Sequence, residues 1–138
     1  MINATLLNNR ATGNCRHGYN IVTGTTGIDL INNIAEGNGY CFATSLGNGI
    51  MIQTNQGYVT SNAYLSGNTV SQSASDSISL VGVTNILLLD NHLASDASCL
   101  YVSGSSIIGG SGNTCQSSTK VIKYFGVNQN LELGAAFV

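Results

Sequence analysis

Three of the six carboxylates in this sequence are candidates for acid–base chemistry: Asp29, Glu36 and Asp90. A glycosidase uses two carboxyl groups about 5–9.5 Å apart, and a calcium site needs several converging oxygens. Glu36 and Asp90 come closest to forming a pair, and no group of acids fits a calcium site. The alternative is that both are solvated turn residues and that Glu36 forms a surface ion pair with Arg10. No metal and no cofactor are predicted.

His17 and His92 are the other possible bases, because histidine titrates near neutral pH. Asp90 and His92 are two residues apart and could face the same way, but neither histidine has an acid at a spacing that would orient its ring. A structural or solvated role is favoured for both. No Ser–His–Asp arrangement and no phosphate-binding loop occur in the sequence.

The four cysteines are Cys15, Cys41, Cys99 and Cys115, and none of them forms a C-x-x-C pair. This spacing argues against zinc and thioredoxin-like chemistry. The even number leaves disulfides open, but a domain of this length does not require them. The sequence therefore favours reduced, mostly buried thiols that pack as small hydrophobic side chains.

Uncharged polar residues dominate the composition, with 17 Asn, 17 Gly, 16 Ser and 12 Thr among 138 residues. A hydrophobic fraction of 43% in short runs argues against disorder. Four Lys and Arg with a net charge of −2 cannot neutralise a phosphate backbone, so nucleic acid is not an expected partner. No apolar run reaches the length of about 18 residues that a membrane span needs. No signal peptide is expected, because the first residues show neither a basic region nor a long apolar run.

A repeat organises the chain. One column of asparagines recurs every 22–30 residues, and four of its members follow a glycine. Its members are Asn14, Asn38, Asn68, Asn91 and Asn113. A second column lies six positions upstream at Asn8, Asn32, Asn62 and Asn85, and is interrupted by Ile107. Asparagine suits a turn because it tolerates the left-handed conformation and bonds its own backbone. Asparagines stacked on one another can also hydrogen-bond along the stack.

Between these columns, apolar residues alternate with polar ones as in half-buried strands. Examples are Ala4 with Leu6, and Ile86 with Leu88. Each repeat offers short strands that bury nothing alone, so the repeats must stack about 4.8 Å apart. The expected fold is an all-β, right-handed parallel β-helix of about five to six coils over residues 1–115. Residues 116–138 are expected to form a terminal coil or two C-terminal strands that cap the stack or join it to other copies.

The pattern of apolar alternation ending in Gly-Asn resembles the pectate-lyase-like right-handed β-helix superfamily. That resemblance implies a protein that acts on or binds polysaccharide, such as a lyase, a glycosidase, an epimerase, an adhesin or a phage tailspike. Met1 already lies inside the strand pattern with no capping helix before it, which favours a piece of a longer protein.

The loop from Gly39 to Gly49 makes one repeat longer than its neighbours. Loops that project from a rigid solenoid are common binding sites. Its aromatic side chains Tyr40 and Phe42, with the amide of Asn48, are the predicted glycan-binding residues. The alternative is that both aromatic rings tuck inward and the loop is inert.

Large apolar side chains also occupy positions that the repeat places on the outside. Ile34, Tyr64 and Leu87 form one outward column in this register, with Leu89 beside it. An exposed apolar stripe usually marks an interface, and the resemblance to tailspikes implies a homotrimer. The predicted function is therefore a tailspike-like β-helix segment, virion-borne or extracellular, that contacts cell-surface polysaccharide. The alternatives are a β-helix lyase or glycoside hydrolase using Asp29, Glu36 or Asp90, and a purely structural or adhesin solenoid.

Overall fold

Strands make up all the regular structure of the described chain. The computed structural model describes residues 2–43, 46–117 and 119–138. The first eight strands are β1 (Ile2–Leu7), β2 (Arg10–Thr12), β3 (Tyr19–Val22), β4 (Thr26–Ile31), β5 (Ile34–Glu36), β6 (Ile50–Gln53), β7 (Ser61–Ser66) and β8 (Thr69–Ser73). The remaining eight are β9 (Ile78–Val81), β10 (Thr84–Leu89), β11 (His92–Ser95), β12 (Ser98–Ser103), β13 (Ser106–Ser111), β14 (Thr114–Ser117), β15 (Lys120–Phe125) and β16 (Gln129–Glu132). Within the described residues no helix is long and apolar enough to cross a membrane.

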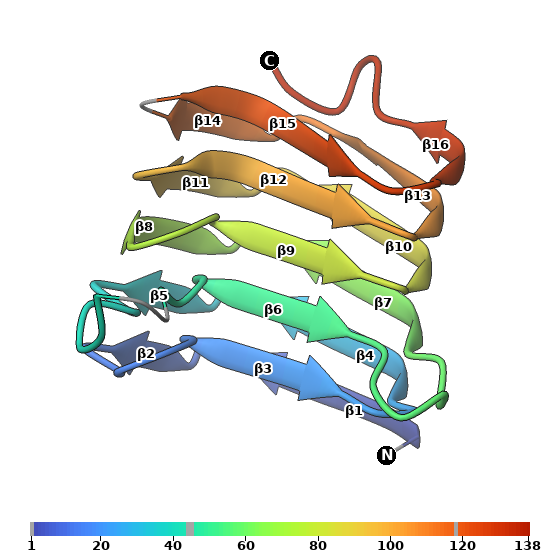
Figure 1. Cartoon of the computed structure of the whole chain (residues 1–138), viewed down its shortest axis with the longest axis horizontal. Helices are drawn as coiled ribbons and strands as arrows, with labels where there is room; N and C mark the ends of the chain where they lie inside the picture. The colour runs from blue at the N-terminus through green and yellow to red at the C-terminus, as the bar shows by residue number, and fades with distance from the viewer. Residues whose placement is uncertain (1, 44–45, 118) are drawn as a thin grey trace.

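The strands form three parallel sheets. Sheet A contains β1, β4, β7, β10, β13 and β16, sheet B contains β2, β5, β8, β11 and β14, and sheet C contains β3, β6, β9, β12 and β15. Each strand pairs with the strand three places further along the chain. The chain therefore winds through A, B and C in turn, and we call each such turn of the chain a coil (Figure 1). The predicted parallel β-helix is confirmed.

The core is a set of stacked apolar columns, because alternate residues of every strand point inward. In sheet A, Leu30, Leu65 and Leu88 lie one above another and are fully buried. Sheet C supplies two further columns, whose fully buried members are Ile50, Ile52, Ile78, Leu80, Leu100 and Val102. A single coil could not bury these side chains, so the core exists only where coils stack on one another.

Asparagines form a continuous ladder at the turn between sheets A and B, where the exposed Asn9 is followed by the buried Asn33, Asn68, Asn91 and Asn113. The Oδ1 atom of each higher asparagine accepts the backbone N–H of the one below, at 2.9–3.0 Å. The Nδ2 atom of each higher asparagine also donates to a backbone carbonyl of the coil below, as Asn91 does to Leu65 at 2.9 Å. The ladder satisfies turn groups that burial would otherwise leave unpaired.

The repeat assigned from the sequence was correct for the third to fifth coils and wrong for the first two. Asn68 stacks on Asn33 and not on Asn38, as the hydrogen bond from Asn33 N to Asn68 Oδ1 shows. Asn38 belongs to a shorter ladder in the following turn, where it accepts the N–H of Asn14 at 3.0 Å. The second coil therefore carries two insertions, residues 39–49 before β6 and residues 54–60 after it, and its spacing could not reveal the true register.

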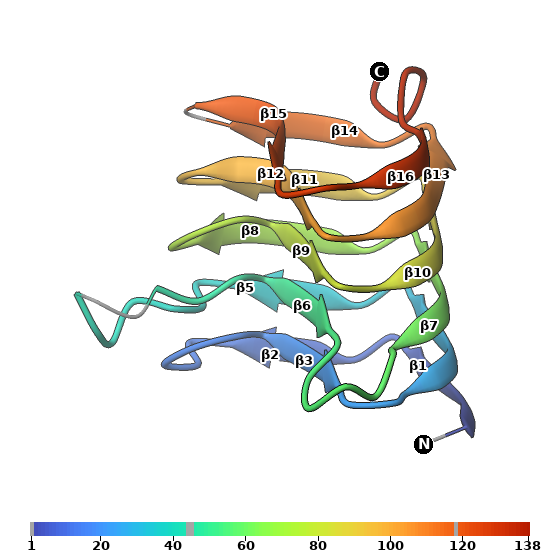
Figure 2. The same cartoon turned by 45° about the vertical axis from the view of Figure 1, so that its right-hand side comes forward.

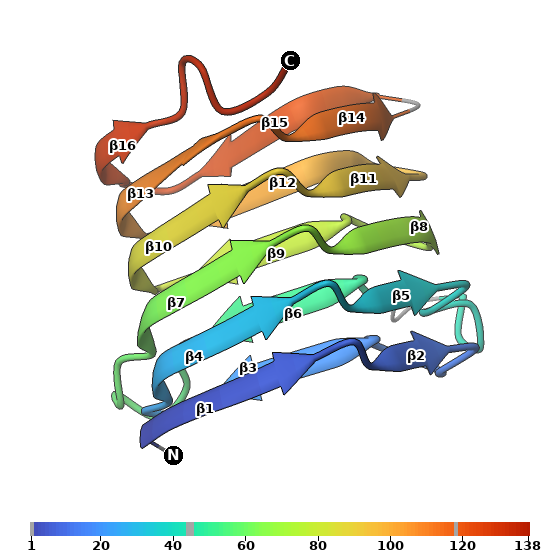
Figure 3. The same cartoon turned by 180° about the vertical axis from the view of Figure 1, so that it is seen from behind.

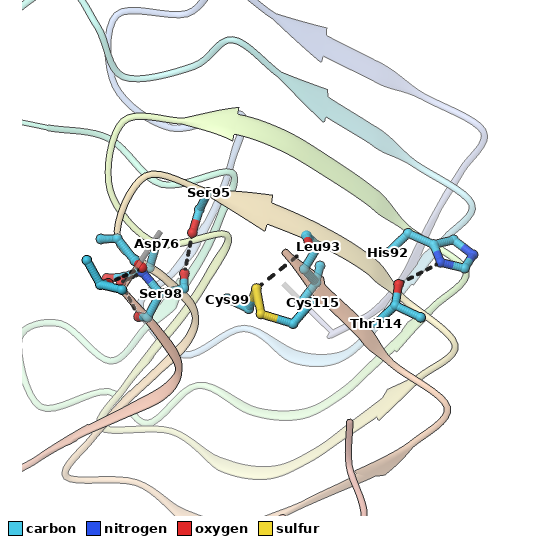
Figure 4. Close-up of a disulfide and its surroundings, with 10 residues drawn as sticks. Asp76, His92, Leu93, Ser95, Ser98, Cys99, Thr114 and Cys115 are labelled. Carbon is cyan, nitrogen blue, oxygen red and sulfur yellow. Dashed lines mark hydrogen bonds between the residues drawn. A yellow bond between two sulfur atoms is a disulfide. The ribbon is translucent and has the colours of Figure 1, made fainter. Parts of the chain in front are cut away.

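All four cysteines are oxidised in two disulfides, Cys15–Cys41 and Cys99–Cys115, so the expectation of free thiols was wrong. Stacking brings residues 26 and 16 positions apart in the sequence to Cα–Cα distances of 4.7 and 5.9 Å, within bonding range. Cys99–Cys115 crosses from sheet C to sheet B beside Leu93 (Figure 4). Closing a loop of this length stabilises a fold by about 3 kcal/mol in the chain-entropy model.

The last residues fold back over the end of the stack. Asn113 donates its backbone N–H to Ala136 at 3.1 Å and pairs with Phe137 in a parallel bridge. Leu133 and Ala136 are buried there. The C-terminal strands β15 and β16 join sheets C and A respectively, so residues 116–138 continue the same stack.

Candidate functional site

The candidate binding surface is the outer face of sheet C (Figure 1). The two insertions of the second coil lie at the two ends of its strand β6. The outward side chains of sheet C form two columns by strand register. One column reads Asn20, Met51, Ser79, Tyr101 and Lys123, and the other reads Val22, Gln53, Val81, Ser103 and Phe125. The columns mix amide, hydroxyl and aromatic groups with the apolar side chains of Val22, Met51 and Val81, and neither contains a carboxylate. Ser79, with 3% exposure, is buried between its neighbours.

Two contacts organise this face. Gln53 Nε2 donates to Asn20 Oδ1 at 3.2 Å, and Lys123 Nζ lies 5.7 Å from the centre of the Tyr101 ring. A cation beside an aromatic face is a stabilising arrangement. Phe125 is 66% exposed at the end of the column. The face therefore offers hydrogen-bonding groups together with aromatic rings, and no pair of groups for acid–base catalysis.

Both insertions of the second coil border this face, one at each end of β6. The 39–49 loop projects outward from the corner between sheets B and C, and the 54–60 loop bulges at the corner between C and A (Figure 2). Tyr40, Phe42 and Tyr58 are 53%, 53% and 64% exposed. The predicted exposure of the loop aromatics is confirmed for Tyr40 and Phe42, while Thr44 and Ser45 of the same loop lie outside the described residues.

The 39–49 loop is held in place at several points. The Cys15–Cys41 disulfide ties it to the first coil. Tyr40 donates its hydroxyl proton to Asp96 Oδ2 at 2.7 Å, reaching the turn two coils further along. Desolvation, that hydrogen bond and the charge of Asp96 raise the pKa of Tyr40 to about 12. The disulfide and this hydrogen bond therefore fix Tyr40 and Cys41 at the start of the loop.

Asn48, unlike Tyr40 and Phe42, is largely buried and hydrogen-bonded within a turn, so we leave it out of the candidate binding surface. It is 8% exposed and belongs to a ladder of polar side chains in the turn between sheets B and C. Its backbone N–H donates to His17 Nδ1 at 3.1 Å, and its Oδ1 accepts the N–H of Asp76 at 3.0 Å. Asp76 in turn accepts from the N–H and hydroxyl of Ser98 (Figure 4).

His17 contributes to this turn as a neutral ring. Burial, followed by the charge of Arg16, lowers the pKa of His17 below 6.5. Its Nδ1 must be unprotonated to accept the N–H of Asn48. The structural role expected for His17 is thus observed, whereas His92 is exposed on sheet B, with Nδ1 3.0 Å from Thr114 Oγ1.

The three candidate catalytic carboxylates lie apart. Glu36 is on sheet B in an ion pair with Arg10, at 2.6 Å, as expected. Asp29 lies on sheet A between Thr5 and Tyr64, and Asp90 sits in a turn two coils beyond Glu36. No two of them occupy neighbouring positions in adjacent coils. Among the described residues no group of three or more His, Cys, Asp or Glu side chains could hold a metal ion.

The apolar column expected for an interface divides between two sheets. Tyr64 and Leu87 are neighbours on sheet A, but Ile34 lies on sheet B between Arg10 and Thr69, so the single stripe was wrong. The same register error that affected the asparagine column caused this. Leu89 also faces outward on sheet A, between Ser66 and Ser111. The structure places Tyr101 on β12 and Lys123 on the neighbouring edge strand β15 of sheet C, and sequence reasoning missed both. Their 22-residue spacing follows the repeat and gives no separate signal of a binding role.

Comparison with known proteins finds no matching family model and no match among curated proteins. The structure is similar to a candidate glycosyl hydrolase from Parabacteroides merdae, with a TM-score of 0.58, 11% identity, and coverage of 86% of this chain and 64% of that one. It is also similar to the A-module of a mannuronan C-5 epimerase from Azotobacter vinelandii, with a TM-score of 0.51, 18% identity, and coverage of 99% and 52%. These likenesses establish the fold, and the chain spans about two thirds and one half of the two proteins.

Proposed function

We propose that this chain is a polysaccharide-binding β-helix whose contact surface is the outer face of sheet C with the 39–49 loop. The observation that carries the proposal is the pair of exposed aromatic rings of Tyr40 and Phe42, next to a disulfide that ties the loop to the first coil and beside the amide groups of Asn20 and Gln53 on sheet C. Sugars present C–H faces that pack on rings such as those of Phe42 and Tyr101, and hydroxyl edges that bond to amides. The absence of carboxylates from the two outward columns favours binding over hydrolysis at this face.

The fold likeness to a candidate glycosyl hydrolase and to a polysaccharide epimerase supports a carbohydrate ligand. The pinned loop supports it further, because a contact surface that is already ordered loses less entropy on binding. We further propose that the chain is a segment of a homotrimeric, tailspike-like protein that recognises cell-surface polysaccharide. Two disulfides agree with a virion-borne or extracellular location, where such bonds persist.

The test is a bacterial glycan array, followed by calorimetric titration with the best-bound oligosaccharide. Phe42→Ala and Tyr101→Ala each remove an aromatic contact worth about 1.5–3 kcal/mol, so binding should weaken by about 10–100-fold. Tyr64→Ala, an aromatic truncation on sheet A, is the matched control and should leave affinity unchanged. Wild-type affinity in both sheet C variants would refute the proposed surface. Release of new sugar ends during the titration would favour an enzyme instead.

A further inference from the structure

One position on sheet A adopts a backbone conformation that its residue type disfavours. The second residue of each sheet A strand has a positive φ, between 51° and 67°. This column contains Asn3, Gly27, Asn62, Asn85, Ile107 and Asn130. Asparagine and glycine tolerate the left-handed region, whereas a β-branched residue there is strained. Ile107, with φ 55°, is 52% exposed, so burial in the core does not offset its strain.

Ile107 also interrupts a ladder of amides on the outside of the sheet. Asn85 donates its Nδ2 proton to Asn62 Oδ1 in the coil below, at 2.6 Å. An asparagine at position 107 could continue this pattern upward, but isoleucine cannot. Within the described part of the chain, the Oδ1 of Asn85 accepts no hydrogen bond and the side chain of Asn130 makes none. Two amides on either side of Ile107 are therefore available to a ligand.

Gly109 leaves a hollow beside Ile107 for which the fold gives no reason. Its backbone does not require glycine, because its φ is not positive. An added Cβ atom would approach only Glu132, at 3.8 Å, which is ordinary contact. A glycine inside a strand weakens it and often marks the close approach of a ligand. The result is a groove of about 260 Å³, lined by Leu87 and Ile107 with Asn85, Asn130 and Glu132. These residues belong to β10, β13 and β16, which are neighbours in sheet A (Figure 3).

We propose that this groove binds one neutral hexose unit of a glycan. Leu87 and Ile107, 42% and 52% exposed, offer an apolar surface to the C–H face of the ring. Asn85, Asn130 and Glu132 offer donors and acceptors to its hydroxyls. The carboxylate of Glu132 disfavours a uronate by like-charge repulsion. This inference rests on the proposed glycan-binding function, but it uses a different face of the β-helix from the sheet C site.

The test is a two-dimensional NMR titration with neutral tetrasaccharides of glucose, mannose and galactose. At least one should give saturable shifts of the Gly109 amide and the Asn85 and Asn130 side-chain amides. Ile107→Asn relieves the strain and refills the ladder. It should therefore raise Tm by about 3–5 °C while weakening binding at this groove at least tenfold, the trade-off expected where strain serves function.

Gly109→Ser places a Cβ atom in the hollow in ordinary contact with Glu132 and should also weaken binding at least tenfold. Gly134→Ala is the matched control, since an added Cβ there meets nothing within 4 Å and lies outside the groove. Unchanged shifts in Ile107→Asn or Gly109→Ser would overturn the inference. So would shifts at Gly109 that depend on protein concentration rather than sugar, because a second copy would then occupy the groove.

The two glycan proposals fail separately in this experiment. Saturable shifts confined to sheet C residues would leave the proposed function intact and refute the groove. Shifts at Gly109 that persist in the Phe42→Ala and Tyr101→Ala variants would support the groove independently of the sheet C surface. The absence of any shift with all three sugars would refute the groove, and a negative glycan array would refute the sheet C proposal.

Discussion

Replacing Asn91 by leucine tests the central claim that buried amides hold the coils together. Asn91 is fully buried in the middle of the ladder. Its Oδ1 accepts from the backbone N–H and from the Nδ2 of Asn68, at 3.0 and 2.9 Å. Its Nδ2 donates to the carbonyl of Leu65 and to Asn113 Oδ1, both at 2.9 Å. Leucine has a similar size and can make none of these bonds.

The expected loss follows from these contacts. The N–H of Asn68 is left buried without an acceptor, which costs about 1–3 kcal/mol. The three other lost bonds contribute about 0.5–1.5 kcal/mol each. Part of the sum is offset by burying an apolar side chain, so Asn91→Leu should lower the free energy of unfolding by about 2–6 kcal/mol. That is a large share of the stability of a typical domain, about 5–15 kcal/mol.

Asn9→Leu is the matched control, because Asn9 is the first and exposed member of the same ladder. Its side chain only donates, to Leu7 and to Asn33, and its backbone N–H keeps its acceptor on Asn33. The loss there should be about 1 kcal/mol. Urea unfolding followed by circular dichroism gives both values. A loss below 1 kcal/mol for Asn91→Leu, or equal losses for the two variants, would refute the stabilising role of the ladder.

Two further predictions concern acid and self-association. Because the pKa of His17 is lowered below 6.5, the stability that its neutral ring supplies is complete above pH 6.5 and is lost as the pH falls through the lowered pKa. Urea unfolding at pH 7.5 and 5 should show this loss of stability in the wild type and in the control variant His92→Gln. The loss should be smaller in His17→Gln, which has no imidazole ring to titrate. Equal pH dependence in His17→Gln and the wild type would contradict the role of the contact between His17 and Asn48. If outward leucines of sheet A form the seam of a homotrimer, Leu89→Asp should dissociate it in light scattering while Gln116→Asp on sheet B does not. A monomeric wild type would end that hypothesis.

The architecture was predictable because each coil repeats the same physical problem. Apolar alternation near Ile86 and Leu88, with recurrent Asn at turns, admits few solutions other than a stack of parallel strands. The register of the first two coils was not predictable, because Asn33 and Asn38 each have an asparagine 24 residues upstream, Asn9 and Asn14, with which they pair. The hydrogen bond between Asn33 and Asn68 shows which of the two asparagines continues the ladder. The sequence could not show this, because the lengths of the two insertions in the second coil were unknown.

The candidate site was predictable in part for the same reason. Tyr40 and Phe42 could be identified because they stand in an insertion, which breaks the repeat visibly. Tyr101 and Lys123 obey the repeat, so nothing in their spacing separates a ligand-facing column from a solvated one. The disulfides were likewise hidden: Cys99 and Cys115 become neighbours only when sheet B closes against sheet C.

The polar composition, which at first sight suggests low complexity, follows from the number of corners in the fold. Every coil must turn from A to B, from B to C and from C to A. Each corner needs residues that tolerate positive φ, such as Asn32, Asp90 and Gly112 at the first, and acceptors for buried backbone N–H groups. Asparagine meets both needs between A and B, while Asn48, Asp76 and Ser98 provide acceptors or donors between B and C. Asn, Gly, Ser and Thr are thus abundant because short strands make turns frequent. Ile107 is the exception on sheet A, because it has a positive φ without being the asparagine or glycine that this conformation favours.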